Sequence, residues 1–177
     1  EKFKVDPAIV FAVIETESAF NPKAKSHIPA YGLMQLVPKS GARDAYLYVY
    51  KEDKYLSKRY LYTPEKNIEL GCAYIAKIRY VYFRDITDDD NAYICVIPAY
   101  NTGIGNVSKT LSGTTKLKPA AEAANKMTRD ELYNTLGIQN FPAQKIRIFY
   151  YGYNFAIFLL EFPTSSTGQK CNRDRCF

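Results

Sequence analysis

Helix start signals constrain the fold of this chain more than any other feature of its sequence. Asp6 and Thr63 each precede a proline, the arrangement that caps and begins an α-helix. The acidic run 88–90 suits a third helix N-terminus, and Thr128 with Glu131 has the spacing of a capping box. No internal repeat is visible, so the sequence predicts one mostly α-helical domain.

The expected elements follow from these starts and from the stop signals behind them. Helices are expected over 7–20, from about 39 to 50, over 64–83, from 89 to a kink or end at Pro98, after 128, and from 142 to 162. Residues 102–119 predict a loop, and the Tyr-rich stretch 46–62 predicts a small β-hairpin or flap. The predicted organisation is a domain over 1–163 and an extended tail over 164–177.

Composition excludes several classes of site. The chain has 177 residues and a net charge of +6, so it suits a single domain whose surface attracts polyanions. His27 is the single histidine and no C-x-x-C pair occurs, which argues against a metal site and against a Ser-His-Asp triad. The apolar stretch 155–162 is too short to span a bilayer. Because no leader precedes the first helix, any export signal is expected to be already removed or never present.

Glu17 lies within the apolar arc of the first predicted helix. On a wheel of about 100° per residue it falls with Ile9, Val13 and Ile14, whereas Glu15 points the other way. A carboxyl on an apolar stripe is desolvated, which raises its pKa as a general acid near neutral pH requires. The alternative is a carboxylate in solvent or paired with Lys or Arg, and the helix by itself favours that alternative.

Four ordered motifs favour the general-acid interpretation of Glu17 instead. They read ESAFNPKAKS from Glu17, GLMQLVP from Gly32, NIELGCAYI from Asn67 and AYNTG from Ala99. In this order they resemble the goose-type-lysozyme-like lytic transglycosylases, which cleave bacterial peptidoglycan. The lead-in YLYTP and the stretch AYIAKIRYVY are most similar to the membrane-bound lytic murein transglycosylase C type. The resemblance covers residues 8 to about 107 and implies a lysozyme-like fold.

The resemblance implies a reaction and a set of residues. Glu17 would be the catalytic acid and base, protonating the oxygen between N-acetylmuramic acid and N-acetylglucosamine. The muramyl C6 hydroxyl would then attack the anomeric carbon and leave a 1,6-anhydro end, so no second carboxylate, metal or cofactor is needed. The residues placed along the substrate groove by the resemblance are Ser26, Met34, Gln35, Tyr100 and Asn101.

Two rival functions remain open. A hydrolytic lysozyme would need a second carboxylate, roughly 5–5.5 Å from the first for retention or about 6.5–9.5 Å for inversion. The candidates for it are Asp44, Asp53, Asp85 and Asp88 to Asp90. The second rival is a non-catalytic glycan-binding module, against which the intact Glu17 motif argues.

The sequence also departs from the family pattern. Where the family carries E-T-R-x-Y, this chain has Lys145 and Phe149 at the Glu and Tyr positions, and Pro29 replaces a usual glycine. The family packing allows a disulfide between Cys72 and Cys95, the alternative being two small buried thiols. Cys171 and Cys176 predict a local disulfide in the tail.

The expected partner is peptidoglycan, bound by a monomer in the bacterial envelope or outside the cell. The envelope form would be periplasmic, or anchored to the outer membrane through a preceding segment. The basic, Tyr-rich stretch 46–62 could stack on sugars or pack on the domain. Nucleic acid is ranked low because no nucleic-acid-binding signature accompanies that stretch.

Overall fold

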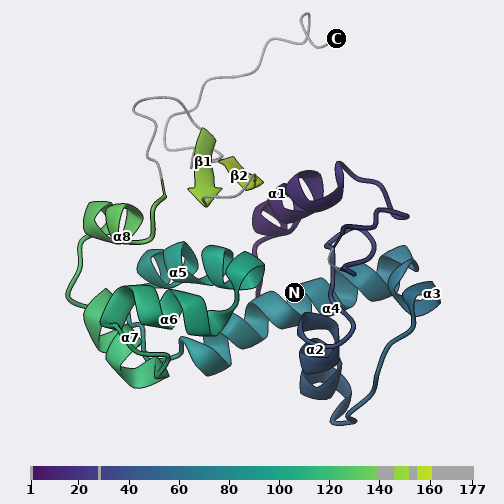
Figure 1. Ribbon diagram of the computed structural model, residues 1–177, viewed down its shortest axis with the longest axis horizontal. Helices are drawn as coiled ribbons and strands as arrows, with labels where there is room; N and C mark the ends of the chain where they lie inside the picture. The colour runs from purple at the N-terminus through teal and green to yellow at the C-terminus, as the bar shows by residue number, and fades with distance from the viewer. Residues whose placement is uncertain (1, 28, 139–145, 152–154, 161–177) are drawn as a thin grey trace, which may run out of the picture.

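Helices followed by one pair of short strands make up the computed structural model, which describes residues 2–27, 29–138, 146–151 and 155–160 (Figure 1). The helical elements are α1 (Pro7–Ser18), α2 (Gly41–Tyr50), α3 (Lys58–Leu61), α4 (Pro64–Lys77), the π-helical turn η1 (Ile78–Tyr82), α5 (Asp89–Thr102), α6 (Ile104–Ser112), α7 (Leu117–Ala124) and α8 (Arg129–Thr135). The strands are β1 (Ile146–Tyr151) and β2 (Phe155–Leu160). The mainly α-helical fold predicted from the sequence is therefore confirmed.

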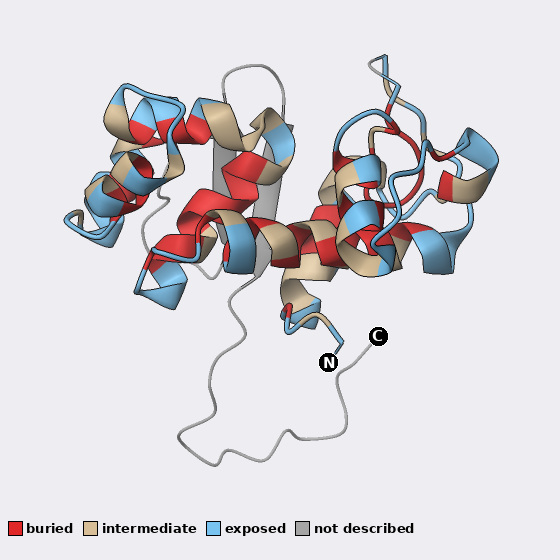
Figure 2. Ribbon diagram, turned by 90° about the horizontal axis from the view of Figure 1, so that it is seen from below, coloured by how far each residue is buried: buried red, intermediate tan, exposed pale blue. Residues whose placement is uncertain are grey.

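The long helix α4 joins two halves of the molecule. Its first turns, through Leu70 and Ala73, pack with α2, α3 and the segment 31–36 in one apolar cluster. Its later turns, through Ile75 and Ala76, pack with α1 and with α5 to α8 in a larger cluster. Figure 2 shows these buried faces turned inward in each half. The domain thus has two apolar cores on one shared helix.

The helix caps expected from the sequence are present. The Asp6 carboxylate accepts a hydrogen bond from the Ala8 amide at 2.8 Å, and Asp88 accepts one from the Asn91 amide at 2.8 Å. The capping box of Thr128 and Glu131 is formed in both directions. These bonds satisfy amides that a helix N-terminus leaves without an intrahelical partner.

The β-hairpin predicted as one option for 46–62 does not form, and the irregular conformation expected of a flap is limited to 51–57. Residues up to Tyr50 complete α2, and α3 forms at 58–61. The alternation of Tyr with other residues suggests a strand, but Ala42, Ala45 and Tyr46 are buried at helical spacing on one face. The Tyr46 and Tyr50 rings stack 4.5 Å apart, centroid to centroid, one helical turn from each other.

The predicted loop at 102–119 is also wrong, because α6 and α7 form there. Each helix has a narrow apolar stripe, with Val107 and Leu111 buried in α6 and Ala120 and Ala124 in α7. Gly113 ends α6 with a φ of 72°, a left-handed conformation that glycine adopts readily, so this glycine marks a helix end and not a long loop. Pro98 does not end α5, which continues to Thr102.

The last long helix, expected from residue 142, is replaced by the antiparallel pair β1–β2, in which Ile146 pairs with Leu160 and Tyr151 with Phe155. The runs IRIFYY and FAIFLL are rich in β-branched and aromatic residues, which favour strands. β2 lies beside α1 (Figure 1). Lys145 and the tail, with its cysteines and the boundary at 163/164, lie outside the described residues, and for Phe149 only the backbone is described.

Cys72 and Cys95 are free thiols, so the disulfide between them is not formed. Cys95 is completely buried in the larger core, whereas Cys72 is half-buried on α4. Burial raises the pKa of both thiols, which keeps them protonated. Both therefore act as small apolar side chains.

No helix in the described ranges combines the length and the apolar character that crossing a bilayer requires.

Asn67 connects three chain segments with a completely buried side chain. Its Nδ2 donates to the carbonyl oxygens of Tyr31 and Leu61, each at 2.8 Å, and its Oδ1 accepts from the Met34 amide at 2.7 Å. The segment 31–36 and the end of α3 are thereby fixed to the first turn of α4. No apolar side chain could satisfy these three backbone groups.

Replacing Asn67 with alanine should therefore lower the free energy of unfolding by about 3–5 kcal/mol, because three buried backbone groups lose their partner. Urea denaturation measures the loss. The matched control is Asn106→Ala, since the exposed Asn106 side chain makes a single bond, to the Thr102 carbonyl at the end of α5, and this control should change stability by less than about 0.5 kcal/mol. Equal effects of the two variants would contradict the role of Asn67.

Candidate active site

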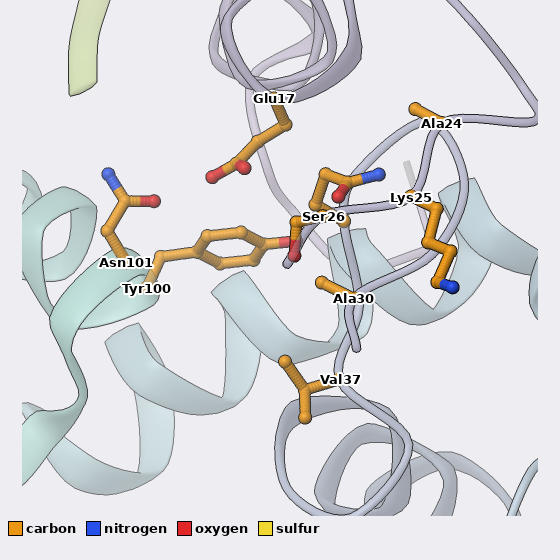
Figure 3. A pocket seen from close by; sticks show the side chains of 9 residues that line it. Glu17, Ala24, Lys25, Ser26, Ala30, Val37, Tyr100 and Asn101 are labelled. Carbon is orange, nitrogen blue, oxygen red and sulfur yellow. The ribbon is translucent and has the colours of Figure 1, made fainter. Parts of the chain in front are cut away.

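Glu17 stands at the C-terminal end of α1, where the chain reverses direction. Ala19 and Phe20 adopt positive φ angles of 47° and 61°, which end the helix and turn the chain back beneath it. Phe20 is exposed because it lies beyond the last helical turn. The Glu17 side chain is half-buried and points into a pocket of about 320 Å³ (Figure 3).

The pocket is assembled from α1, from the segment 24–37 and from the end of α5. Its lining residues are Glu17, Ala24, Lys25, Ser26, Ala30, Gln35, Val37, Tyr100 and Asn101. In Figure 3 the Glu17 carboxyl hangs from α1 above the Tyr100 ring, with Asn101 on one side and Ser26 on the other. Residues more than 80 positions apart in the sequence thus surround one carboxyl group.

The Glu17 carboxyl has no hydrogen bond or ion pair with any described residue, so neither alternative offered by the helix alone is realised. Burial without a compensating cation raises its pKa from 4.5 to about 7. Near neutral pH this group is present in both protonation states. It can therefore give a proton and later take one back.

Tyr100 forms the floor of the pocket. Its hydroxyl donates to the Met34 carbonyl oxygen at 2.7 Å, and its ring contacts Tyr74 at a centroid distance of 5.4 Å. Burial raises the pKa of Tyr100 well above its usual value, and the nearby Glu17 carboxylate adds to the rise. Tyr100 therefore stays protonated, with its proton already committed to Met34, and acts as a wall beside Glu17.

The segment 24–36 is held by its own backbone bonds. The Gly32 amide donates to the Ala24 carbonyl at 3.0 Å, and the Ser26 amide donates to the Ala30 carbonyl at 3.2 Å. Gly32 has a φ of 80°, and any Cβ there would overlap the Leu61 carbonyl oxygen and Asn67, so the position requires glycine. Gln35 also has a positive φ, 46°, and its side chain donates to the Gly32 carbonyl at 2.8 Å.

Five of the six residues predicted for the site line this pocket: Glu17, Ser26, Gln35, Tyr100 and Asn101. The sixth, Met34, does not. Its side chain is completely buried against Gly71, where an added Cβ would overlap the Met34 sulfur. Met34 contributes its backbone instead, with its amide bound by Asn67 and its carbonyl by Tyr100.

Four lining residues were absent from the predicted set: Ala24, Lys25, Ala30 and Val37. Three of them lie inside the two motifs that supplied Glu17 and Gln35, and Ala30 lies between those motifs. Position within a motif could therefore have identified Ala24, Lys25 and Val37, whereas no such signal marked Ala30.

Among the described residues that line this pocket, Glu17 is the single carboxylate. Within the described part of the chain no three His, Cys, Asp or Glu side chains are grouped so that they could hold a metal ion. The Glu17 carboxyl can therefore give a proton to a bound ligand or take one from it, in a pocket of about 320 Å³.

Comparison with known proteins identifies relatives. Residues 1–122 match the transglycosylase SLT domain family. The chain is 37% identical over 150 residues to the membrane-bound lytic murein transglycosylase C of Sodalis glossinidius, covering 85% of this chain and 41% of that protein. It is 38% identical over 149 residues to the protein of that name from Klebsiella pneumoniae, covering 84% and 41%. The chain thus spans about two fifths of the length of these relatives.

A solved structure shows the same fold. An inactive mutant of the lytic transglycosylase Slt from Pseudomonas aeruginosa, with a glutamate changed to glutamine, superposes with a TM-score of 0.52 at 27% identity. The match covers 76% of this chain and 21% of that one.

Glu17→Gln should stabilise the protein more at high pH than at low pH. The raised pKa means that the folded state holds the Glu17 proton more tightly than the unfolded chain does. This contribution to stability is complete below pH 4.5 and is lost as the pH rises through about 7. The gain of the neutral glutamine over wild type should grow to at most about 3 kcal/mol by pH 8.

Urea unfolding at pH 5 and pH 8 measures this gain. Glu15→Gln is the control, since Glu15 is exposed on the other side of α1 and should show no such pH dependence. A gain for Glu17→Gln that is the same at both pH values would refute the desolvated carboxyl.

Proposed function

The chain belongs to the transglycosylase SLT domain family, and on this premise we propose that it is a peptidoglycan lytic transglycosylase in which Glu17 is the single general acid and base. The observation that carries the proposal is the lone Glu17 carboxyl, half-buried, unpaired and with a pKa of about 7. The Pseudomonas aeruginosa Slt structure, described as inactive after one glutamate became glutamine, is consistent with this role.

The reaction needs one proton to be given and one to be taken at the same site. Protonated Glu17 gives its proton to the oxygen between N-acetylmuramic acid and N-acetylglucosamine, and that glycosidic bond breaks through an oxocarbenium-like transition state. The C6 hydroxyl of the same muramyl residue forms the new bond to the anomeric carbon. Its proton passes to the Glu17 carboxylate, which restores the acid and leaves a 1,6-anhydro end.

Each candidate for a second carboxylate has a partner away from the pocket. Asp44 is bound by Lys77 and Tyr82, and Asp53 by Arg43. Asp88 caps α5, Asp89 and Asp90 pair with Arg79 and Arg129, and Asp85 pairs with Arg84 at 3.7 Å. None of them lines the Glu17 pocket. An internal nucleophile that needs no activated water therefore fits this site better than hydrolysis.

The remaining residues of the pocket are proposed to hold the sugars. Ser26, Gln35 and Asn101 offer a hydroxyl and two amides around the carboxyl, and the Tyr100 ring offers a flat apolar face. Neutral donors and acceptors of this kind suit sugar hydroxyls and acetamido groups. The proposed location is the bacterial cell envelope, where peptidoglycan lies, and the relatives are named as membrane-bound enzymes.

Digestion of purified sacculi, with products identified by mass spectrometry, tests the proposal. Wild type and the exposed-site control Glu15→Gln should release anhydro-muropeptides. Glu17→Gln should be slower by about 10³-fold, because the acid is lost while the shape of the pocket is kept. Reducing-end products, heavier by one water, would make the protein a hydrolase. Equal activity of wild type and Glu17→Gln would remove Glu17 from the mechanism.

The pH dependence of kcat/KM gives a second test. The first step uses protonated Glu17, so kcat/KM should be flat below the pKa of about 7 and should fall about tenfold per pH unit above it. Soluble glycan fragments assayed from pH 5 to pH 9 supply the profile. A profile that rises through pH 7 would mean that Glu17 acts first as a base.

A further inference from the structure

Two further cavities continue the Glu17 pocket toward α2. The nearer one, of about 230 Å³, shares four lining residues with the pocket: Gln35, Val37, Tyr100 and Asn101. The farther one, of about 350 Å³, shares Ser40 and Tyr74 with the nearer one. The three cavities therefore adjoin one another in a row from Glu17 to the face of α2 that carries Arg43 and Leu47, and we call this row the groove.

The far cavity has four charged lining residues, and three of them already have partners. Both Asp53 carboxylate oxygens accept hydrogen bonds from the Arg43 guanidinium at 2.5 Å. The Asp44 carboxylate accepts from Lys77 at 2.5 Å and from the Tyr82 hydroxyl at 2.9 Å. Asp44 and Asp53 are thus neutralised within the protein.

Lys39 is the fourth charged residue of the far cavity. It is exposed, and within the described residues its ammonium has no ion pair or hydrogen bond. Leu47 and Tyr74 supply apolar surface in the same cavity. The open end of the groove therefore presents one uncompensated positive charge beside an apolar wall, which suits a peptide that carries a carboxylate.

In peptidoglycan, such carboxylates are found on the peptide stems attached to muramic acid, while the N-acetylated sugar rings themselves are neutral. We propose that the far cavity binds a peptide stem of the glycan whose bond lies at Glu17, with the Lys39 ammonium paired to a stem carboxylate. This inference rests on the proposed function. It makes Lys39 a specificity-determining residue that selects anionic, stem-bearing glycan.

Asp53 limits the charge available for this contact. Its bidentate bond to Arg43 holds a second cation of the cavity in a neutral pair, and Arg43 lowers the pKa of Asp53. Removing the Asp53 carboxylate would leave Arg43 free to meet the stem. Lys39→Glu and Asp53→Ala should therefore change substrate preference in opposite directions.

The test compares one substrate in two charge states. Stem-bearing glycan fragments are used either as free acids or after their stem carboxylates have been converted to amides, and kcat/KM is measured for each. The preference ratio, free acid over amide, should fall about tenfold in Lys39→Glu, mainly through KM, and should rise in Asp53→Ala. Lys126→Glu, an equal charge change at an exposed site outside the groove, should keep the wild-type ratio.

Binding of the same fragments to Glu17→Gln separates this inference from the proposed function. If wild type cleaves neither substrate, the transglycosylase proposal fails, and the dissociation constants measured with and without Lys39→Glu still decide the role of Lys39. If the ratio in Lys39→Glu equals that in Lys126→Glu, in cleavage and in binding, the stem-binding cavity is overturned. A lower ratio for Lys39→Glu alone supports it.

Discussion

The buried amide of Asn67 is the interaction on which the site depends. Its three hydrogen bonds fix the carbonyls of Tyr31 and Leu61 and the amide of Met34 to the first turn of α4. The Met34 carbonyl in turn accepts the Tyr100 hydroxyl, so the floor beneath Glu17 is tied to the same helix. The helices that carry Glu17 and Asn101, α1 and α5, pack in the larger core, whereas Tyr31 and Leu36 pack in the smaller one, and α4 is the element that both cores share. A polar side chain that is completely buried thus sets the geometry of a pocket to which it does not itself belong.

The raised pKa of Glu17 depends on burial without a cation paired to its carboxyl. Most acidic side chains near the groove are matched by a cation, as in the pairs Arg43–Asp53 and Lys77–Asp44. Glu17 has no such partner, and desolvation alone keeps its pKa near 7. Among the described charged residues that line the far cavity, Lys39 is the one that has no partner. Both proposals therefore rest on an ionisable side chain without a partner, Glu17 or Lys39, because such a group can still exchange a proton or form an ion pair with a ligand.

Local signals in the sequence predicted the helix boundaries well where capping chemistry was explicit. Asp6, Asp88 and Thr128 all cap helices as expected. Local signals failed where residue composition and periodicity disagreed. The stretch 102–119 has the composition of a loop, yet the stripes through Val107 and Ala120 are buried in α6 and α7. The run after 145 looked like a helix continuing an apolar pattern, yet it forms strands that pair with each other and lie beside α1. In 102–119, burial of the apolar stripes decided the outcome, whereas after 145 the strand preference of β-branched and aromatic residues agrees with the observed pairing.

The sequence by itself determined the family, the mostly helical class and five of the residues around the pocket, because ordered motifs record which residues a fold of this kind brings together. It also placed Glu17 on an apolar stripe. It left open whether that carboxyl meets solvent, a cation or neither, since a helix wheel contains no information about other segments. Only the tertiary structure showed that the segment 24–37 and the end of α5 surround Glu17 without any described residue, Lys25 included, forming an ion pair with its carboxyl. The same packing buried Met34 and left Lys39 open, because burial and charge pairing are properties of residues that meet in space.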